Sequence, residues 1–169
     1  MSAMARGCAL VVIVLVDGVA LFRGEEIAAS RIDLSYEPTA AAVSPDDTIV
    51  CISGSNKVIH VYSVSDNNTL TEINSISHHV REIHSLSFSS DGSKLASADV
   101  RDICVWDTSS WSPLISKNRW CFHAQKISNL AWSPDGEVLA SAGLDDSIYL
   151  WSLNKKMKRV SYHFCHRAR

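Results

Sequence analysis

The sequence lacks the features that mark several large classes of protein. Its 169 residues carry 16 basic and 18 acidic side chains and a formal charge of −2, so no excess of positive charge indicates nucleic-acid binding. The five cysteines form no CxxC pair, which disfavours a secreted disulfide framework and favours reduced thiols in the cytosol. Charged residues make up 20% and hydrophobic residues 46%, values that fit a folded chain and not a disordered one.

An apolar run near the N-terminus is too short to cross a membrane. It has nine residues, Cys8–Val16, whereas a spanning helix needs about 20. With Arg6 ahead of it, the run imitates the start of a signal peptide. The same run, followed by the turn Asp17-Gly18 and by Val19–Phe22, also fits a hairpin. We favour the hairpin, because the rest of the chain repeats such elements.

A short turn motif recurs along the chain at a nearly constant spacing. Its copies are Ser44-Pro45-Asp46-Asp47, Ser89-Ser90-Asp91-Gly92 and Ser133-Pro134-Asp135-Gly136. The third-position aspartates lie 45 and then 44 residues apart, and an aromatic residue follows each of them after 16, 15 and 16 residues, at Tyr62, Trp106 and Trp151. A period of about 40–45 residues with this turn is typical of a β-propeller blade.

Each period divides into short apolar strands. In the last period the expected strands are Ile127–Trp132, Val138–Ala142, Ser147–Trp151 and, as an outer strand, Lys158–Phe164. No window shows a long apolar stripe with the helical period of about 3.6 residues. The sequence therefore predicts an all-β fold, a partial β-propeller of four-stranded blades.

The last period resembles the complete pattern of the WD-repeat family. The residues that carry the resemblance, besides the turn motif, are His123, Ser141, Asp145 and Trp151. In that family the corresponding side chains form a hydrogen-bonded tetrad inside the blade, so the resemblance implies a structural role. A buried indole N–H needs an acceptor, which a hydroxyl supplies, and a histidine can link that hydroxyl to a carboxylate.

The two earlier periods depart from this pattern. The middle period keeps a partial tetrad of His79, Ser97 and Trp106. Val100 stands where the carboxylate belongs, and Asp99 or Asp102 can replace it only if the turn shifts by a residue or two. The first period ends in Tyr62, has Asn56 near the aspartate position and offers no matching histidine. We therefore expect its polar network to be incomplete.

The expected division of the chain leaves the propeller open. We assign 1–35 to a partial blade of three strands with its first strand missing, 36–79 and 80–123 to two blades, and 124–169 to a blade plus the start of the next. About three and a half blades cannot close a ring, which typically needs about 4–8. We therefore expect a piece of a longer chain, or one that needs missing blades or self-association to close the ring.

The order of the unusual blades is similar to the second propeller of the actin-interacting protein 1 family. The chain has a blade ending in Tyr62, then one with Ala96-Ser97-Ala98-Asp99, then the regular one. The resemblance implies a non-enzymatic cytoplasmic protein of the cortical actin cytoskeleton, whose partners are actin filaments and ADF/cofilin and which promotes filament disassembly. It implies neither a nucleic-acid nor a membrane partner. A scaffold in another complex is the alternative.

No pattern in the sequence indicates catalysis or a metal centre. There is no GxSxG elbow and no P-loop. The compact clusters Cys121-Phe122-His123 and His163-Phe164-Cys165-His166 lack the four ligands and the spacing of a structural zinc site. The basic run Lys155–Arg159 fits either a contact with an acidic partner or a solvated loop. We assign no catalytic, cofactor-binding or metal-binding residue, and the partner-binding residues stay unassigned.

Overall fold

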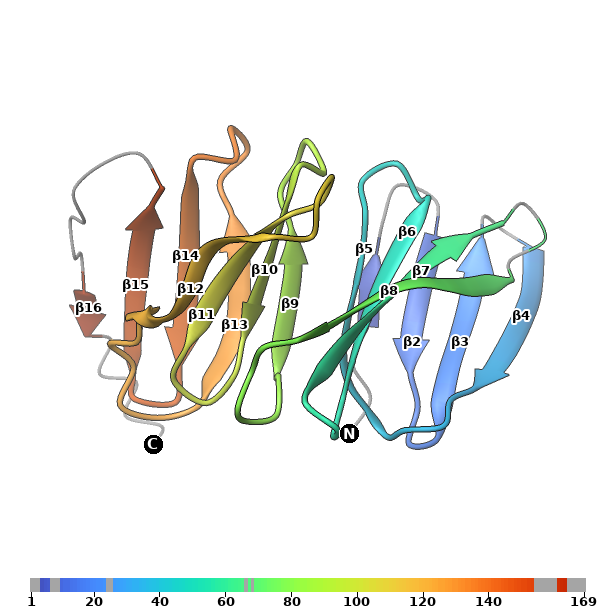
Figure 1. The fold of residues 1–169 in the computed structure, drawn as a ribbon, viewed down its shortest axis with the longest axis horizontal. Helices are drawn as coiled ribbons and strands as arrows, with labels where there is room; N and C mark the ends of the chain where they lie inside the picture. Colours follow the sequence, from blue (N-terminus) through green and yellow to red (C-terminus); the bar gives the residue numbers. More distant parts are fainter. Residues whose placement is uncertain are drawn as a thin grey trace, which may run out of the picture.

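The fold consists of β-strands arranged in separate sheets. The computed structural model describes residues 4–6, 10–23, 26–65, 67, 69–153 and 161–163. In these residues the strands form four sheets, each with four antiparallel strands (Figure 1). The first sheet contains β1 (Met4–Arg6), β2 (Leu10–Val14), β3 (Gly18–Arg23) and β4 (Glu26–Asp33). The second contains β5 (Pro38–Val43), β6 (Ile49–Gly54), β7 (Val58–Val64) and β8 (Leu70–Ser77).

The other two sheets repeat the same meander. The third contains β9 (Ser85–Phe88), β10 (Lys94–Ala98), β11 (Ile103–Asp107) and β12 (Pro113–Trp120). The fourth contains β13 (Ile127–Trp132), β14 (Val138–Gly143), β15 (Ser147–Ser152) and β16 (Ser161–His163). The all-β prediction of four-stranded blades is confirmed.

The described sheets follow one another in chain order, and within them the ring is not closed. Strand β2 contacts β5, β5 contacts β9, and β9 contacts β13, so each sheet packs beside the next. Figure 1 shows the first and fourth sheets on opposite sides of the molecule. The described sheets therefore form an open arc, as expected for a partial propeller.

The first sheet differs from the sequence prediction. We expected three strands with the first one missing, but Met4–Arg6 forms β1 and pairs with β2, Met4 opposite Ile13 and Arg6 opposite Val11. The prediction of a missing strand was wrong because three residues are too few to show a period of two, and β1 is defined only by its pairing. Five residues of the apolar run, Leu10–Val14, form β2, which is hydrogen-bonded on both sides.

A tight turn joins β2 to β3, as the hairpin interpretation requires. The N–H of Leu15 donates to the carbonyl of Gly18 over 2.9 Å. A Cβ at Gly18 would clash with the carbonyl of Ile32 in β4, so glycine permits the close approach of β3 and β4 there. The basic run at 155–159 and the residues Cys165 and His166 lie outside the described residues, as does most of the expected outer strand 158–164.

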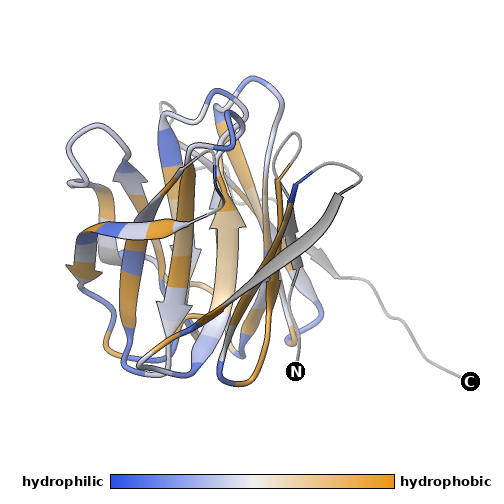
Figure 2. Cartoon of the chain, turned by 90° about the vertical axis from the view of Figure 1, so that its right-hand side faces the viewer, coloured by the Kyte–Doolittle hydropathy of each residue, from blue (hydrophilic) through white to orange (hydrophobic). Residues whose placement is uncertain are grey.

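Apolar side chains fill the space between neighbouring sheets. One cluster joins the first and second sheets and includes Leu10, Leu21, Val50 and Tyr62. A second cluster joins the second and third sheets, and a third cluster joins the third and fourth. Figure 2 shows hydrophobic segments alternating with hydrophilic ones along the strands. Among the described residues there is no helix that could span a membrane.

Candidate functional site

The repeated turn motif has the same hydrogen bonds in its three copies. In the third sheet the Ser89 hydroxyl donates to Asp91 over 2.6 Å, and the Lys94 N–H donates to the Ser89 oxygen over 2.9 Å. The serines at 44 and 133 are bonded in the same way. The fourth residue of each turn has a left-handed backbone, with φ of 60° at Asp47, 71° at Gly92 and 67° at Gly136. This conformation favours glycine, which two of the three copies have.

The four residues singled out in the fourth sheet form one chain of hydrogen bonds. The Trp151 indole N–H donates to the Ser141 oxygen over 2.8 Å, and the same oxygen lies 2.8 Å from Nε2 of His123. Nδ1 of His123 lies 3.0 Å from Asp145. The tryptophan can only donate and the carboxylate can only accept. The Ser141 hydroxyl therefore donates to Nε2, and the N–H at Nδ1 donates to Asp145.

The third sheet contains the same chain of hydrogen bonds with its carboxylate in another place. Trp106 Nε1 donates to the Ser97 oxygen over 2.8 Å, and that oxygen lies 2.7 Å from Nε2 of His79. Nδ1 of His79 lies 3.1 Å from Oδ2 of Asp99. The structure thus brings together the three expected residues and adds Asp99, one of the two substitutes that the sequence left open. Asp102 instead accepts the backbone N–H of Asn118.

The length of the turn explains the position of Asp99. In the fourth sheet the turn between the last paired residues covers 143–147, whereas in the third sheet it covers 99–102 and is one residue shorter. The missing residue explains why Trp106 follows Asp91 after 15 residues, whereas Trp151 follows Asp135 after 16. Asp99 occupies the position of Gly143, two residues after the serine, and its carboxylate reaches the histidine from there. A Cβ at Gly143 would clash with His123. With the histidine placed as in the fourth sheet, a carboxylate therefore cannot stand two residues after the serine, as Asp99 does in the third sheet.

The second sheet replaces the chain of hydrogen bonds with a tyrosine pair. The hydroxyls of Tyr36 and Tyr62 lie 2.8 Å apart. Tyr62 stands in the tryptophan position, and the buried Ile52 stands in the serine position. A Cβ at Gly54 would clash with the Tyr36 ring, just as one at Gly143 would clash with His123. Tyr36 therefore fills the place of the histidine that the sequence search did not find.

Burial and hydrogen bonds fix the ionisation of these groups. Burial raises the pKa of Asp99, but hydrogen bonds from His79 and from two backbone N–H groups lower it by more than burial raises it. The pKa of Asp99 therefore lies below its ordinary value. The pKa of Asp145 is lowered by the same balance of burial and hydrogen bonds from the Ala124 N–H and His123. Burial, above all, raises the pKa of Tyr36 and of Tyr62. At neutral pH the carboxylates are therefore charged and the tyrosines neutral.

The geometry gives these networks a structural role. His123 and Ser141 are buried, and their polar atoms already bond to one another, so neither is presented to a substrate. Each network ties two neighbouring strands to the segment that precedes the sheet. Among the described residues no group of three His, Cys, Asp or Glu side chains could hold a metal ion. The exposed Cys121 donates its thiol hydrogen to the carbonyl of Asn118.

One end of the molecule carries exposed apolar side chains in its connections. The β2–β3 turn, the β8–β9 link, the β12–β13 link and the β14–β15 turn all lie at the lower end in Figure 1. These connections contain Val16, Val80, Phe122 and Leu144, which are 73%, 64%, 42% and 58% exposed. We call these residues the apolar end. Phe122 also stacks on Trp151, with ring centroids 5.7 Å apart.

Comparison with known proteins identifies repeats in the chain. The family model "WD domain, G-beta repeat" matches residues 70–107 and 116–152. The first matched stretch starts with the outer strand β8 and the second starts inside the outer strand β12. Each ends with the third strand of the next sheet.

Two curated proteins are similar to this chain. The "66 kDa stress protein" of Physarum polycephalum is 32% identical over 167 residues, which are 98% of this chain and 27% of that protein. "Actin-interacting protein 1-2" of Arabidopsis thaliana is 35% identical over 102 residues, which are 60% of this chain and 16% of that protein. The chain thus spans about a quarter or less of the length of these relatives.

Proposed function

We propose, from the premise that this chain is a WD-repeat protein resembling actin-interacting protein 1, that it binds actin filaments carrying ADF/cofilin and promotes their disassembly. The observation that carries the proposal is the 35% identity to Actin-interacting protein 1-2. The order of the blades supports the same family: the tyrosine-ended second sheet, the third sheet with Asp99 and the regular fourth sheet follow one another in the chain. The proposed site of action is the cortical actin of the cytoplasm.

The proposed activity is binding without chemistry. The buried networks hold the connections of three successive sheets in fixed positions, and a rigid set of connections suits a protein that recognises a surface composed of more than one subunit. No catalytic step is proposed, because the polar groups that come together in the described sheets are used to hold strands and turns.

The apolar end is the surface that we propose for contact with the filament. Exposed apolar side chains that gather at one end of a fold mark an interaction site more often than scattered ones do. Phe122 is a candidate for a central contact, since aromatic residues contribute disproportionately to binding energy. Its stacking on Trp151 orients the ring before any partner arrives.

Co-sedimentation with actin filaments tests the proposal directly. The chain is centrifuged with bare filaments and with filaments saturated with cofilin, and the bound fraction is measured at increasing filament concentration. We expect more binding to the cofilin-decorated filaments. Equal binding to both, or binding to neither, would contradict the proposed function.

Matched variants test the proposed surface. Val80→Glu and Leu144→Glu each place a charge on the apolar end without removing a buried contact, because both side chains are more than half exposed. We expect either variant to weaken cofilin-dependent binding. The control is Ile73→Glu, which alters a residue of similar exposure, 52%, in the outer strand β8. An equal loss in the control would show that the apolar end is not the contact surface.

A scaffold role in another complex is the second candidate. It is favoured by one observation, that the relative matched over 98% of this chain is named a stress protein and its name does not mention actin. Under this alternative the chain sediments with neither kind of filament but still folds. Far-UV circular dichroism on the same preparation separates this result from a loss of structure.

A further inference from the structure

One face of the fourth sheet carries apolar side chains that take part in no junction with another described sheet. Strands β14 and β15 pair Ala140 with Leu150 and Ala142 with Ile148. Their neighbours along the strands, such as Trp151, pack toward the third sheet, so these four side chains point the other way. All four are partly exposed, and none belongs to the three apolar clusters. We call these four residues the trailing face.

The same positions are buried in the sheets that have a neighbour on this side. In the third sheet Ala96 pairs with Val105 and Ala98 with Ile103, and all four are fully buried against the fourth sheet. The equivalent positions of the second sheet are also fully buried, at Cys51, Ser53, Ile59 and Val61. The trailing face therefore has the composition of a surface that packs against a further sheet.

The first strand of the fourth sheet shows the same difference. Ala131 in β13 pairs with Ala140 and is exposed. Ala42 in β5 has the equivalent position, because it pairs with Cys51, and it is only 5% exposed. A position that is covered inside the arc is thus open at the fourth sheet.

The first sheet has an apolar face on the side away from the second sheet. Strands β2 and β3 pair Val11 with Phe22 and Ile13 with Ala20. Their neighbours along the strands, such as Leu21, pack toward the second sheet, so these four side chains point away from it. Val11, Ile13 and Phe22 are partly exposed and belong to none of the apolar clusters. We call these four residues the leading face.

The two faces match the two halves of an internal junction. Phe22 has the position that Tyr62, Trp106 and Trp151 have in the following sheets, and each of these three packs toward the preceding sheet. Phe22 has no N–H or hydroxyl, so the leading face needs no polar partner. A leading face placed on a trailing face would bring an aromatic ring against alanine and branched side chains, as at the junction of the third and fourth sheets.

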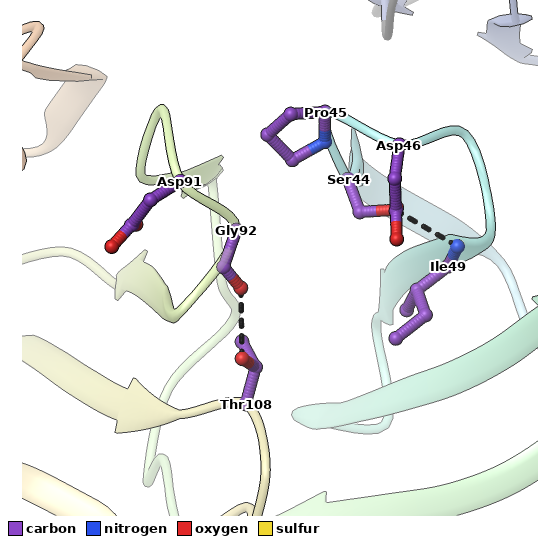
Figure 3. A pocket seen from close by; sticks show the side chains of 7 residues that line it. All are labelled: Ser44, Pro45, Asp46, Ile49, Asp91, Gly92 and Thr108. Carbon is purple, nitrogen blue, oxygen red and sulfur yellow. Dashed lines mark hydrogen bonds between the residues drawn. The ribbon is translucent and has the colours of Figure 1, made fainter.

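The turns are not required to hold such a junction together. Between the second and third sheets a pocket of about 220 Å³ separates the turn at Ser44 from the turn at Gly92 (Figure 3). The hydrogen bonds beside it stay within each sheet: the Ile49 N–H donates to the Ser44 oxygen, and the Thr108 hydroxyl donates to the Gly92 carbonyl. The apolar side chains of the strands therefore join these two sheets.

We infer that two copies of this chain join through these faces into a ring of eight sheets. The leading face of each copy packs against the trailing face of the other, which gives two identical junctions related by a two-fold axis. One copy cannot pair its own faces, because its first and fourth sheets lie on opposite sides of the molecule (Figure 1). Eight sheets lie within the range of about 4–8 for closed propellers, and a third copy would exceed it. This inference does not rest on the actin proposal.

Sedimentation velocity on the full chain gives the first test. We expect one species with twice the mass of a single chain, since the ring is closed and offers no free face for further copies. A chain that stays monomeric at every concentration, or an open series of larger assemblies, would overturn the inference.

Variants of the two faces give the second test. Leu150→Glu alters the trailing face and Phe22→Glu the leading face. Each should raise the dissociation constant of the dimer at least about 100-fold, because every junction would then bury an unpaired charge. The matched control is Leu114→Glu in the outer strand β12, where the leucine is 43% exposed; it should leave the dimer intact. An equal effect of this control would contradict the assignment of the faces.

Mixing the two variants tests which faces pair. Phe22→Glu keeps its trailing face and Leu150→Glu keeps its leading face, so an equimolar mixture should form a mixed dimer with one intact junction. Energy transfer between the labelled variants should therefore appear only in the mixture. A dimer in either variant alone, or no transfer in the mixture, would refute the pairing of leading with trailing faces. If circular dichroism shows that Leu150→Glu does not fold, Ala140→Glu alters the same face from β14, and the mass of the unaltered chain still decides the outcome.

Discussion

Replacing Asp99 with asparagine would test the hydrogen-bond chain of the third sheet. Oδ1 of Asp99 accepts the N–H groups of Arg101 and Asp102, each over 2.9 Å, and Oδ2 accepts from His79. An asparagine has only one oxygen. Its NH₂ group must face either the N–H of His79 or the two backbone N–H groups, so donors face donors in both orientations.

The cost follows from the burial of these groups. Asp99 is 2% and His79 8% exposed, so water cannot replace the lost acceptor. A hydrogen bond to a charged group contributes about 1.5–3 kcal/mol, and a buried donor without an acceptor costs about 1–3 kcal/mol. We expect Asp99→Asn to lower the free energy of unfolding by about 2–3 kcal/mol. With an m value of about 2 kcal/mol/M, the urea midpoint would fall by about 1–1.5 M.

The pH dependence of this effect has a definite sign. The pKa of Asp99 in the folded chain lies below its ordinary value. The stability contributed by its carboxylate is therefore fully present above about pH 4, the ordinary pKa in the unfolded chain, and is lost as the pH falls through the lower folded pKa. The difference in urea midpoint between wild type and Asp99→Asn should stay constant from pH 7 to pH 5 and shrink below about pH 4.

Asp102→Asn is the matched control, since it makes the same substitution in the same turn. Asp102 accepts one backbone N–H, from Asn118, and an asparagine oxygen can accept the same bond. We expect a change within about 0.5 kcal/mol. If Asp99→Asn costs no more than this control in urea unfolding followed by tryptophan fluorescence, the assignment of Asp99 to the chain of hydrogen bonds is wrong.

Further variants address the fourth sheet, the tyrosine pair of the second sheet and the repeated turn motif. Trp151→Phe removes the donor to Ser141 and should cost about 1–3 kcal/mol in urea unfolding; an unchanged midpoint would contradict the network of the fourth sheet. Tyr62→Phe leaves the Tyr36 hydroxyl without its partner and should cost about 1 kcal/mol. Adding Tyr36→Phe should then cost little more, and strictly additive losses would argue against the pair. The midpoint difference between wild type and Asp91→Asn should shrink as the pH falls below about 4, because Asp91 has a folded pKa of about 2; a difference that stays constant down to about pH 2 would refute this.

The regular parts of the fold can be predicted from the sequence because their signals are local. The Ser-Pro-Asp-Gly turn and the alternating strands of the fourth sheet lie within one period, and the spacing to Trp151 depends only on strand and turn lengths. Strand β1 could not be found in the same way. Its three residues owe their conformation to pairing with β2, a contact between segments that shows no pattern in so short a stretch.

The irregular networks depend on geometry that a single period does not reveal. Asp99 replaces the missing turn carboxylate only because the turn is one residue shorter, and that shift appears only when the strand register is known. Tyr36 takes the histidine position with a different residue type, so a search for histidine cannot find it.

The offset between matched repeats and sheets also suggests where the chain could be divided. The residues between the two repeats, 108–115, cover the β11–β12 turn and the first residues of β12, inside the third sheet. Two polypeptides that meet in this turn would each carry an incomplete sheet, one ending with β11 and the other beginning with β12. The exposed edges would complement each other through the backbone pairing seen between these strands. This turn is therefore a suitable division point for a split reporter, whose signal returns when the two halves reassemble.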